Sequence, residues 1–253
     1  MPSSSTTLPM NISEERFLKL ERQVTANGHA LSTLQPSFPS GGSHMVHRKL
    51  ALPIPLASYA IGATTWLLGL LVLHVRNITE INFWIVTGIP MGSILTILCG
   101  MGEFFTGNTF GCALFSAVGG IIFGLSMPFL PWSGIQTAFA QTVGGNQEET
   151  LKLVNASGGI YLEVIFVPLL MLLIAAQKTA LVFVWNLTMI IIVVITLGIS
   201  NMTGSESCLV VSGIFLLLTT AGLFYGGTSI LLAEVGHPLA KFVPLGSLNS
   251  KEN

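Results

Sequence analysis

Charged side chains are scarce in this chain, and the shortage limits what kind of protein it can be. Only 8% of the residues are Asp, Glu, Lys or Arg, whereas 51% are hydrophobic. A soluble domain carries about 25% charged residues, because its surface faces water. No Asp, Glu, Lys or Arg occurs from Phe104 to Gln147. The deficit excludes an ordinary water-soluble domain and favours a protein that lies in a bilayer.

Cysteine is also rare, and the usual enzyme motifs are missing. Cys99, Cys112 and Cys208 lie far apart, which indicates neither a disulfide framework nor a metal cluster. No His-Glu-x-x-His, Gly-x-Ser-x-Gly or phosphate-binding loop occurs. We therefore expect no metal, no cofactor and no enzymatic activity. The net charge of −1 gives no reason to expect nucleic acid as a partner.

Six long apolar segments follow a polar N-terminal region. They cover about residues 53–74, 83–102, 109–130, 156–176, 180–199 and 208–232. Each is near the roughly 20 residues that a helix needs to cross the hydrocarbon, and backbone in lipid must satisfy its own hydrogen bonds. The sequence predicts an all-α integral membrane protein, a six-transmembrane-helix bundle over residues 51–234.

The two ends of the chain are expected to lie outside the bundle. Residues 1–50 are polar and predict a cytoplasmic N-terminal tail that is mostly disordered, with one short helix at about residues 11–25. Residues 235–253 are expected to form a cytoplasmic C-terminal tail.

The basic residues predict the orientation of the bundle, because Lys and Arg are enriched in cytoplasmic loops. With the N-terminus inside, the inner side holds Arg48, Lys49, Lys178, Lys241 and Lys251, and the outer side holds only Arg76 and Lys152. We expect a multi-pass protein of the plasma membrane with both termini in the cytoplasm.

Small residues recur every four positions in the third segment, at Cys112, Ser116, Gly120 and Gly124, with Gly119 beside them. Gly222 and Gly226 repeat the spacing in the sixth segment. Helices in lipid associate through close contact of small residues. The pattern indicates packing within the bundle, an interface between subunits, or the lining of a path.

Two carboxylates stand out in these apolar surroundings. Glu103 lies between the second and third segments, and Glu163 lies within the fourth. An ionisable residue at membrane depth is by default a functional-site hypothesis. Glu103 either exchanges a proton or holds the loop by accepting hydrogen bonds from the next helix start. Glu163 is expected to face the bundle interior or a wet cavity, unless its span begins later.

Pro53-Ile54-Pro55 opens the first segment. Proline suits a helix start, so a plain start is one interpretation. The other is a non-helical opening whose helix N-terminus faces a carboxylate.

Hydroxyl side chains within the segments either line a polar path or bond their own backbone. They are Ser58, Thr64, Thr65, Ser116, Thr188, Thr196, Thr219, Thr220 and Tyr225.

The run Glu-Phe-Phe-Thr-Gly-Asn-Thr-Phe-Gly, from Glu103 to Gly111, resembles a signature of the acetate uptake transporter family. That family includes the bacterial succinate–acetate permeases and the fungal acetate–ammonia permeases. The segment 52–57 is similar to the family's Asn-Pro-Ala-Pro-Leu-Gly motif, and His47-Arg48-Lys49 resembles fungal members. The resemblance covers residues 47–248 and suggests a divergent fungal member.

The resemblance implies a six-helix protomer, usually hexameric, that carries acetate or similar small carboxylates, in many cases with a proton. The substrate path implied in this way involves Pro53, Pro55, Leu56, Asn108, Thr109, Ser116 and Val118, with a proton or helix-start role for Glu103.

The chain departs from the family pattern where an aromatic narrowing is expected. Val118 replaces a family Tyr, and Ile121-Ile122 replace the Phe-Trp that follows it. Leu52, Ala57 and Gly102 replace the family's Asn, Gly and Trp. Loss of aromatic bulk should widen the path, so we expect a substrate that differs from acetate or is larger.

The favoured function is transmembrane transport of acetate or a related small monocarboxylate by a homo-oligomer, with protons and the lipid bilayer as further partners. A nearly uncharged path passes a protonated acid more cheaply than a bare charge. Two alternatives stay open: a channel or exporter for ammonia or another neutral solute, and a membrane protein that transports nothing.

Overall fold

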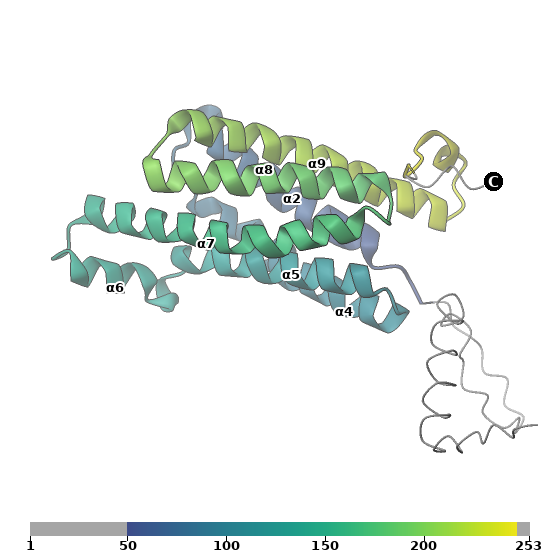
Figure 1. Ribbon diagram of the computed structural model, residues 1–253, viewed down its shortest axis with the longest axis horizontal. Helices are drawn as coiled ribbons and strands as arrows, with labels where there is room; N and C mark the ends of the chain where they lie inside the picture. Colours follow the sequence, from purple (N-terminus) through teal and green to yellow (C-terminus); the bar gives the residue numbers. More distant parts are fainter. Residues whose placement is uncertain (1–49, 247–253) are drawn as a thin grey trace, which may run out of the picture. The chain divides into compact units, whose positions relative to one another are not determined.

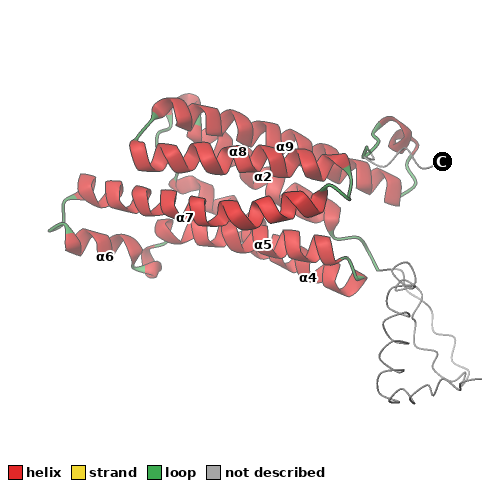
Figure 2. Cartoon of the chain, in the orientation of Figure 1, coloured by secondary structure: helices red, strands yellow, loops and turns green. Residues whose placement is uncertain are grey.

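The computed structural model describes residues 50–246, and helices make up most of this stretch. Figure 2 shows these helices in red, and no strand occurs in the described stretch. Six helices are long and apolar enough to cross a membrane, at Ile54–Val72, Asn82–Thr106, Thr109–Phe129, Gln147–Ala176, Leu181–Thr203 and Glu206–Glu234. The predicted all-α bundle of six membrane-spanning helices is confirmed. The predicted disordered tail and the helix at 11–25 lie outside the described residues.

The spans form a ring in which neighbours in sequence are neighbours in space. α2 (Ile54–Val72) packs along α9 (Glu206–Glu234), α9 along α8 (Leu181–Thr203), and α8 along α7 (Gln147–Ala176). α5 (Thr109–Ser126) packs along α4 (Thr96–Thr106), and α4 returns to α2. Figure 1 shows α7, α8 and α9 side by side along the longest axis. The contact between α5 and α7 is the least extensive in the ring.

The bundle has two ends. We use the name terminal end for the one at which α2, α5 and α8 begin. The short helix α6 (Ile135–Thr142) lies in the α5–α7 connection, at the opposite end, and packs beside α7 (Figure 1).

The second span changes its helix type along its length. A 3-10 turn at Asn82–Trp84 (η2) and a short turn at Ile85–Thr87 (α3) lead into a π-helix at Gly88–Leu95 (η3), and α4 begins only at Thr96. Pro90 lies inside the π segment. Proline lacks an N–H, and its ring clashes with a carbonyl in the preceding α-helical turn. A wider turn accommodates both effects, whereas the apolar pattern predicted only that a helix would be present.

Small residues on α5 let neighbouring helices approach closely. A Cβ added to Gly119 would lie 2.6 Å from the Cγ1 of Ile97 on α4. Gly124 faces the Tyr161 hydroxyl of α7 closely, whereas a Cβ at Gly120 would meet no atom within 4 Å. The small residues of α5 therefore pack mainly within the bundle, and Gly120 is the member that stays open.

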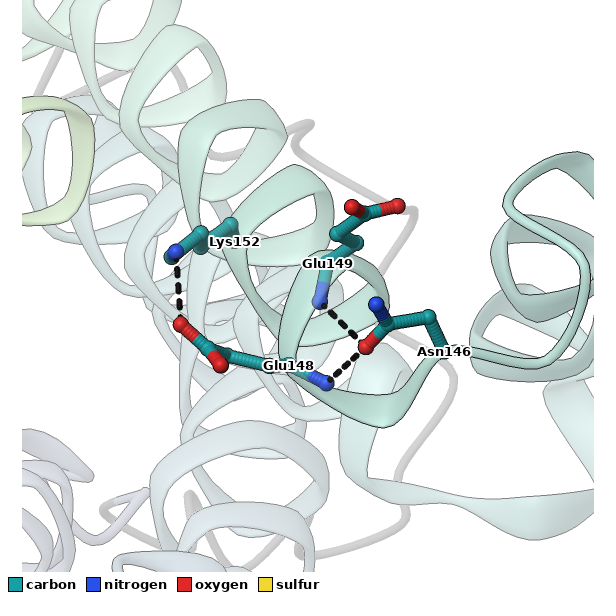
Figure 3. A network of polar contacts seen from close by, with 4 residues as sticks. All are labelled: Asn146, Glu148, Glu149 and Lys152. Carbon is teal, nitrogen blue, oxygen red and sulfur yellow. Dashed lines mark hydrogen bonds and ion pairs between the residues drawn. The ribbon is translucent and has the colours of Figure 1, made fainter.

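α7 starts nine residues before the predicted span at 156–176, because polar contacts extend it beyond the apolar part. Asn146 Oδ1 accepts the backbone N–H groups of Glu148 at 3.1 Å and Glu149 at 3.4 Å, as Figure 3 shows. Lys152 Nζ lies 2.7 Å from Glu148 Oε1. A helix of 30 residues is about 45 Å long, which exceeds the roughly 30 Å hydrocarbon thickness. The first turns of α7 therefore project beyond the hydrocarbon.

Glu163 does not face the bundle interior, so that expectation is wrong. α7 buries Leu162, Ile165 and Leu169 against its neighbours. The helical register turns Glu163 away from that stripe, and its side chain is exposed beside exposed Val164.

The chain after α9 folds back onto the terminal end. Ser229 Oγ donates to the Val243 carbonyl at 2.5 Å, and the Tyr225 hydroxyl donates to the Pro244 carbonyl at 2.7 Å. The backbone N–H of Leu181 donates to the Gly246 carbonyl at 3.2 Å. The predicted C-terminal tail is therefore tied to α8 and α9 as far as residue 246, and Tyr225 holds this tail.

Candidate functional site

A cavity of about 120 Å³ lies at the centre of the ring, and we call it the central cavity. Side chains of α2, α5, α7, α8 and α9 line it together with Trp84. Most are Leu, Ile, Val and Phe, and the polar ones besides Trp84 are Ser58, Thr64, Thr65, Asn186 and Thr219. Among the described residues on this wall, none is Asp, Glu, Lys, Arg or His. Such a wall favours a neutral or largely apolar solute over a bare ion.

The threonines named from the sequence are already hydrogen-bonded. Four of them donate to a backbone carbonyl one turn earlier on their own helix, at 2.8 to 2.9 Å: Thr64, Thr188, Thr196 and Thr219. The Thr65 and Thr220 hydroxyls lie 2.8 Å apart and join α2 to α9. Of the two roles expected for these hydroxyls, hydrogen bonding within the protein is the one that they have. They therefore offer a solute little polar surface.

Two polar side chains on the wall carry an atom that has no hydrogen-bond partner within residues 50–246. Asn186 is 8% exposed and Trp84 is 3% exposed, and the atoms concerned are Asn186 Oδ1 and Trp84 Nε1. A buried polar group without a partner costs about 1–3 kcal/mol. Asn186 Oδ1 packs against Gly222 of α9, so it is enclosed by the protein and does not face a solute.

A second cavity of about 130 Å³ lies at the terminal end, and we call it the terminal cavity. It is lined by Ile54, Asn108, Phe110, Gly111, Leu114, Phe115, Thr179 and Phe183. Leu114, Phe115 and Phe183 border both cavities. The ring of Phe183 meets that of Phe110 edge to face, with centroids 5.9 Å apart. Three apolar side chains thus separate the two cavities.

The loop before α5 is organised around Glu103, whose side chain is 0% exposed. Asn108 Oδ1 accepts the Gly111 N–H at 3.1 Å and caps α5, while Asn108 Nδ2 donates to Glu103 Oε2 at 2.5 Å. Glu103 Oε1 has no hydrogen-bond partner among the described residues. A Cβ at Gly111 would lie 2.8 Å from Glu103 Oε2, so only glycine leaves room for this arrangement.

The turn between α4 and α5 closes with a glycine in the left-handed conformation. Gly107 has φ 77°, and its N–H donates to the Phe104 carbonyl at 3.1 Å. The N–H of Asn108 donates to the Glu103 carbonyl at 3.0 Å. This pair of bonds is the Schellman motif, and it places the Asn108 side chain directly beside the Glu103 carboxyl group.

Pro53 and Pro55, which open the first apolar segment, start a regular helix. The Ala57 N–H donates to the Pro53 carbonyl at 3.1 Å, and Pro55 is buried in the first turn. A Cβ at Gly102 would lie 2.7 Å from Pro53 Cγ, so α4 packs directly on this proline. Leu56 is 50% exposed. The geometry is that of the plain helix start.

The other named residues fall in three places. Asn108 lines the terminal cavity and Val118 lines the central cavity. Thr109 is exposed as the first residue of α5. Ser116 packs against Gly100 of α4, and its Oγ is buried without a hydrogen-bond partner in the described part of the chain. The structure brings Asn108 and Glu103 together, whereas Val118 lies in the other cavity, beyond Leu114, Phe115 and Phe183. The transport roles of the residues named from the sequence stay predictions.

Sequence reasoning missed Asn186, Trp84 and Phe183. Asn186 carries a signal that could have been used, since it is the only Asn, Gln or charged residue from Ala180 to Ser200. Polar side chains within membrane helices are costly and mark sites. Phe183 and Trp84 carry no comparable signal, because aromatic residues are common in apolar helices.

Comparison with known proteins shows which family the chain resembles. The family model described as "GPR1/FUN34/yaaH family" matches residues 32–240. The chain is 27% identical over 214 residues to the "Glyoxylate pathway regulator" of Yarrowia lipolytica, which covers 84% of this chain and 74% of that protein. It is 35% identical over 98 residues to "Acetate permease A" of Emericella nidulans, which covers 38% of this chain and 33% of the permease.

The fold is similar to that of a solved structure. The bacterial acetate channel SatP superposes with a TM-score of 0.60 at 25% sequence identity. The match covers 78% of this chain and 100% of the channel chain. The six-helix ring therefore matches the whole channel protomer.

Proposed function

The chain belongs to the GPR1/FUN34/yaaH family, and from this premise we propose that it conducts acetate or a related small monocarboxylate across a membrane through the centre of its bundle. The observation that carries the proposal is the structural match to an acetate channel over the whole of that channel's chain. A cavity at the centre of the ring, with Val118 on its wall, supports a route inside each protomer.

The proposed route joins the two cavities. A solute from the terminal end meets the terminal cavity at Asn108 and passes Leu114, Phe115 and Phe183 into the central cavity. Hydrophobic constrictions of this kind hold back water and ions until side chains move. The edge-to-face contact of Phe183 with Phe110 makes Phe183 the side chain whose rotation opens the constriction in this proposal.

We propose that a proton crosses the membrane only as part of the undissociated acid, and that no side chain of the protein carries it. Glu103 lines neither cavity, and its contact with Asn108 supports a helix-start role. Replacement of Glu103 by Gln should therefore leave the pH dependence of uptake unchanged. A shifted pH profile in Glu103→Gln, with the protein still folded, would assign the proton to this carboxyl group instead.

We also propose a homo-oligomer, a hexamer by resemblance, in the plasma membrane with both termini in the cytoplasm. The exposed position of Glu163 supports an assembly. A carboxylate that faced lipid would cost about 2.5–3.5 kcal/mol, and a neighbouring subunit removes that exposure. The mass of the purified protein in detergent tests this, with a multiple of 26.9 kDa expected after subtraction of the micelle. A monomer would contradict it.

Uptake into proteoliposomes tests the transport proposal. Liposomes with the purified protein should accumulate labelled acetate faster than protein-free liposomes. Val118→Trp should reduce uptake to the protein-free level by filling the central cavity, and Val118→Ala, which removes volume from the same wall, should not. Ile121→Trp provides a second blocking variant on the same wall. Wild-type uptake no faster than protein-free liposomes, or undiminished uptake by both folded Trp variants, would overturn the proposal.

An ammonia channel is the second candidate, because the uncharged cavity wall suits a small neutral solute equally well. The same liposomes, loaded with a pH-sensitive dye and exposed to an ammonium gradient, discriminate the two. Ammonia flux without acetate flux would replace the first candidate with the second.

A further inference from the structure

The contact between α5 and α7, which we call the α5–α7 seam, is the weak place in the ring of helices. It is the least extensive contact in the ring, although both helices line the central cavity, with Ile121 on α5 and Ile165 on α7 among the wall residues. In the described part of the chain, a single hydrogen bond joins the two helices: the Tyr161 hydroxyl donates to the Ile121 carbonyl at 3.2 Å. At this place the cavity wall is held together mainly by one side chain.

Gly124 of α5 gives the Tyr161 ring its place. A Cβ at Gly124 would collide with the Tyr161 hydroxyl oxygen and lie 2.9 Å from Tyr161 Cζ. The absence of a side chain therefore lets the phenol lie directly against α5, where its hydroxyl meets the Ile121 carbonyl. A backbone carbonyl has two lone pairs, so it accepts this bond in addition to one within its own helix. Tyr161 and Gly124 thus fit together as the closing contact of the seam.

The seam lies towards the end of the bundle that is opposite the terminal end. α5 begins at the terminal end and finishes at Ser126, so Ile121 and Gly124 lie in its last two turns. On the other side of the central cavity, Phe183 belongs to the constriction that leads to the terminal cavity. Segments with few packing contacts open at a lower free-energy cost than well-packed ones. The seam is therefore the place at which the ring separates most readily.

We propose that the α5–α7 seam is a second gate, through which the central cavity opens towards the end opposite the terminal end, and that Tyr161 closes this gate. Tyr161 is a positioning residue, because it acts through the Ile121 backbone and does not itself line the cavity. This inference rests on the proposed function, since a gate beside the central cavity serves passage only if solutes cross there. It goes further by naming the joint that moves and the residue that closes it.

The reactivity of a cysteine in the cavity wall tests this inference without any flux. Ile165 is 6% exposed, so a cysteine at this position should react with a water-soluble thiol reagent only when the wall opens. The full-length protein in detergent carries Ile165→Cys and lacks its own cysteines, Cys99, Cys112 and Cys208. Addition of Tyr161→Phe removes one hydrogen bond, which should shift the balance towards the open seam and speed the reaction about two- to tenfold.

Two matched controls separate a gate from a general loss of stability. The Tyr59 hydroxyl lies 3.0 Å from Thr228 Oγ1 and joins α2 to α9, and Tyr59 does not line the cavity. Tyr59→Phe should lower the thermal midpoint about as much as Tyr161→Phe does, but it should leave the reaction rate unchanged. Gly124→Ala displaces the Tyr161 ring and should also speed the reaction, whereas Gly120→Ala, in open space, should not.

The outcomes separate this inference from the transport proposal. Equal reaction rates in the folded Tyr161→Phe and Tyr59→Phe variants, or in the folded Gly124→Ala and Gly120→Ala variants, would overturn the gate. Faster reaction in Tyr161→Phe and Gly124→Ala alone supports it, and Tyr161→Phe should then also raise the rate of acetate uptake into liposomes. Faster reaction without acetate flux in any variant would overturn transport and leave the moving seam intact. Acetate flux with equal reaction rates would do the reverse.

Discussion

Removal of the Asn108 side chain should destabilise the protein more than the same change at another helix cap. Asn108 and Asn146 both accept backbone N–H groups at the start of a helix, α5 and α7 respectively. Only Asn108 also donates to a buried carboxyl group, that of Glu103, at 2.5 Å. Asn108→Ala and Asn146→Ala therefore both remove a helix cap, and only Asn108→Ala also removes a contact with a buried carboxyl group.

The expected magnitudes follow from these contacts. Loss of an Asn cap costs about 1 kcal/mol, which is the whole effect expected for Asn146→Ala. Asn108→Ala also leaves Glu103 Oε2 buried without its partner, which adds about 1–3 kcal/mol. The sum for Asn108→Ala is about 2–4 kcal/mol.

Thermal unfolding in detergent, followed by tryptophan fluorescence, measures the difference. At about 2–4 °C per kcal/mol for a chain of this length, Asn146→Ala should lower the midpoint by about 3 °C and Asn108→Ala by about 6–12 °C. Glu103→Gln should lower the midpoint by an amount between these two values, because the side-chain oxygen of Gln still accepts a hydrogen bond from Asn108. Equal shifts for the two cap variants would refute the reasoning that Glu103 and Asn108 act as one structural unit.

Three further predictions concern the route and the packing around it. Val118→Tyr narrows the central cavity and should shift preference from longer acids towards acetate in competition uptake; an unchanged order of substrates would contradict this. Phe183→Ala joins the two cavities and should raise the uptake rate while reducing chain-length selectivity, whereas a slower rate would argue against a constriction there. Gly119→Val should prevent α4 and α5 from packing and abolish a monodisperse gel-filtration peak, while Gly120→Val, in open space, should keep the bundle folded; similar behaviour of the two would show that the packing is misassigned.

Much of the fold could be predicted from the sequence, because bilayer thickness fixes the length of a spanning helix. Apolar length alone identified six spans, and the short connections after Ala176 and Thr203 fix α7, α8 and α9 as neighbours. The π-helix at Pro90 could not be predicted, since proline in a membrane helix is also compatible with a kink. The outward direction of Glu163 was missed because a charge was assumed to seek the interior of a single protomer.

The candidate site was less accessible to sequence reasoning. The motif around Glu103 left two roles open, proton exchange and a helix start, and the Asn108 contacts have the geometry of a helix start. The central cavity depends on which faces of five helices converge, and hydropathy does not contain that information. Asn186 was overlooked because attention went to carboxylates and hydroxyls, although one amide in an apolar helix is also an expensive residue.

In the proposed route, solutes cross through the central cavity beside Val118. The most direct test is acetate uptake by Val118→Cys in a background without Cys99, Cys112 and Cys208, before and after reaction with a small thiol-specific reagent. If solutes cross this cavity, uptake stops when the cysteine is modified and returns when the modification is reduced. Full uptake by protein whose residue 118 is quantitatively modified would contradict it.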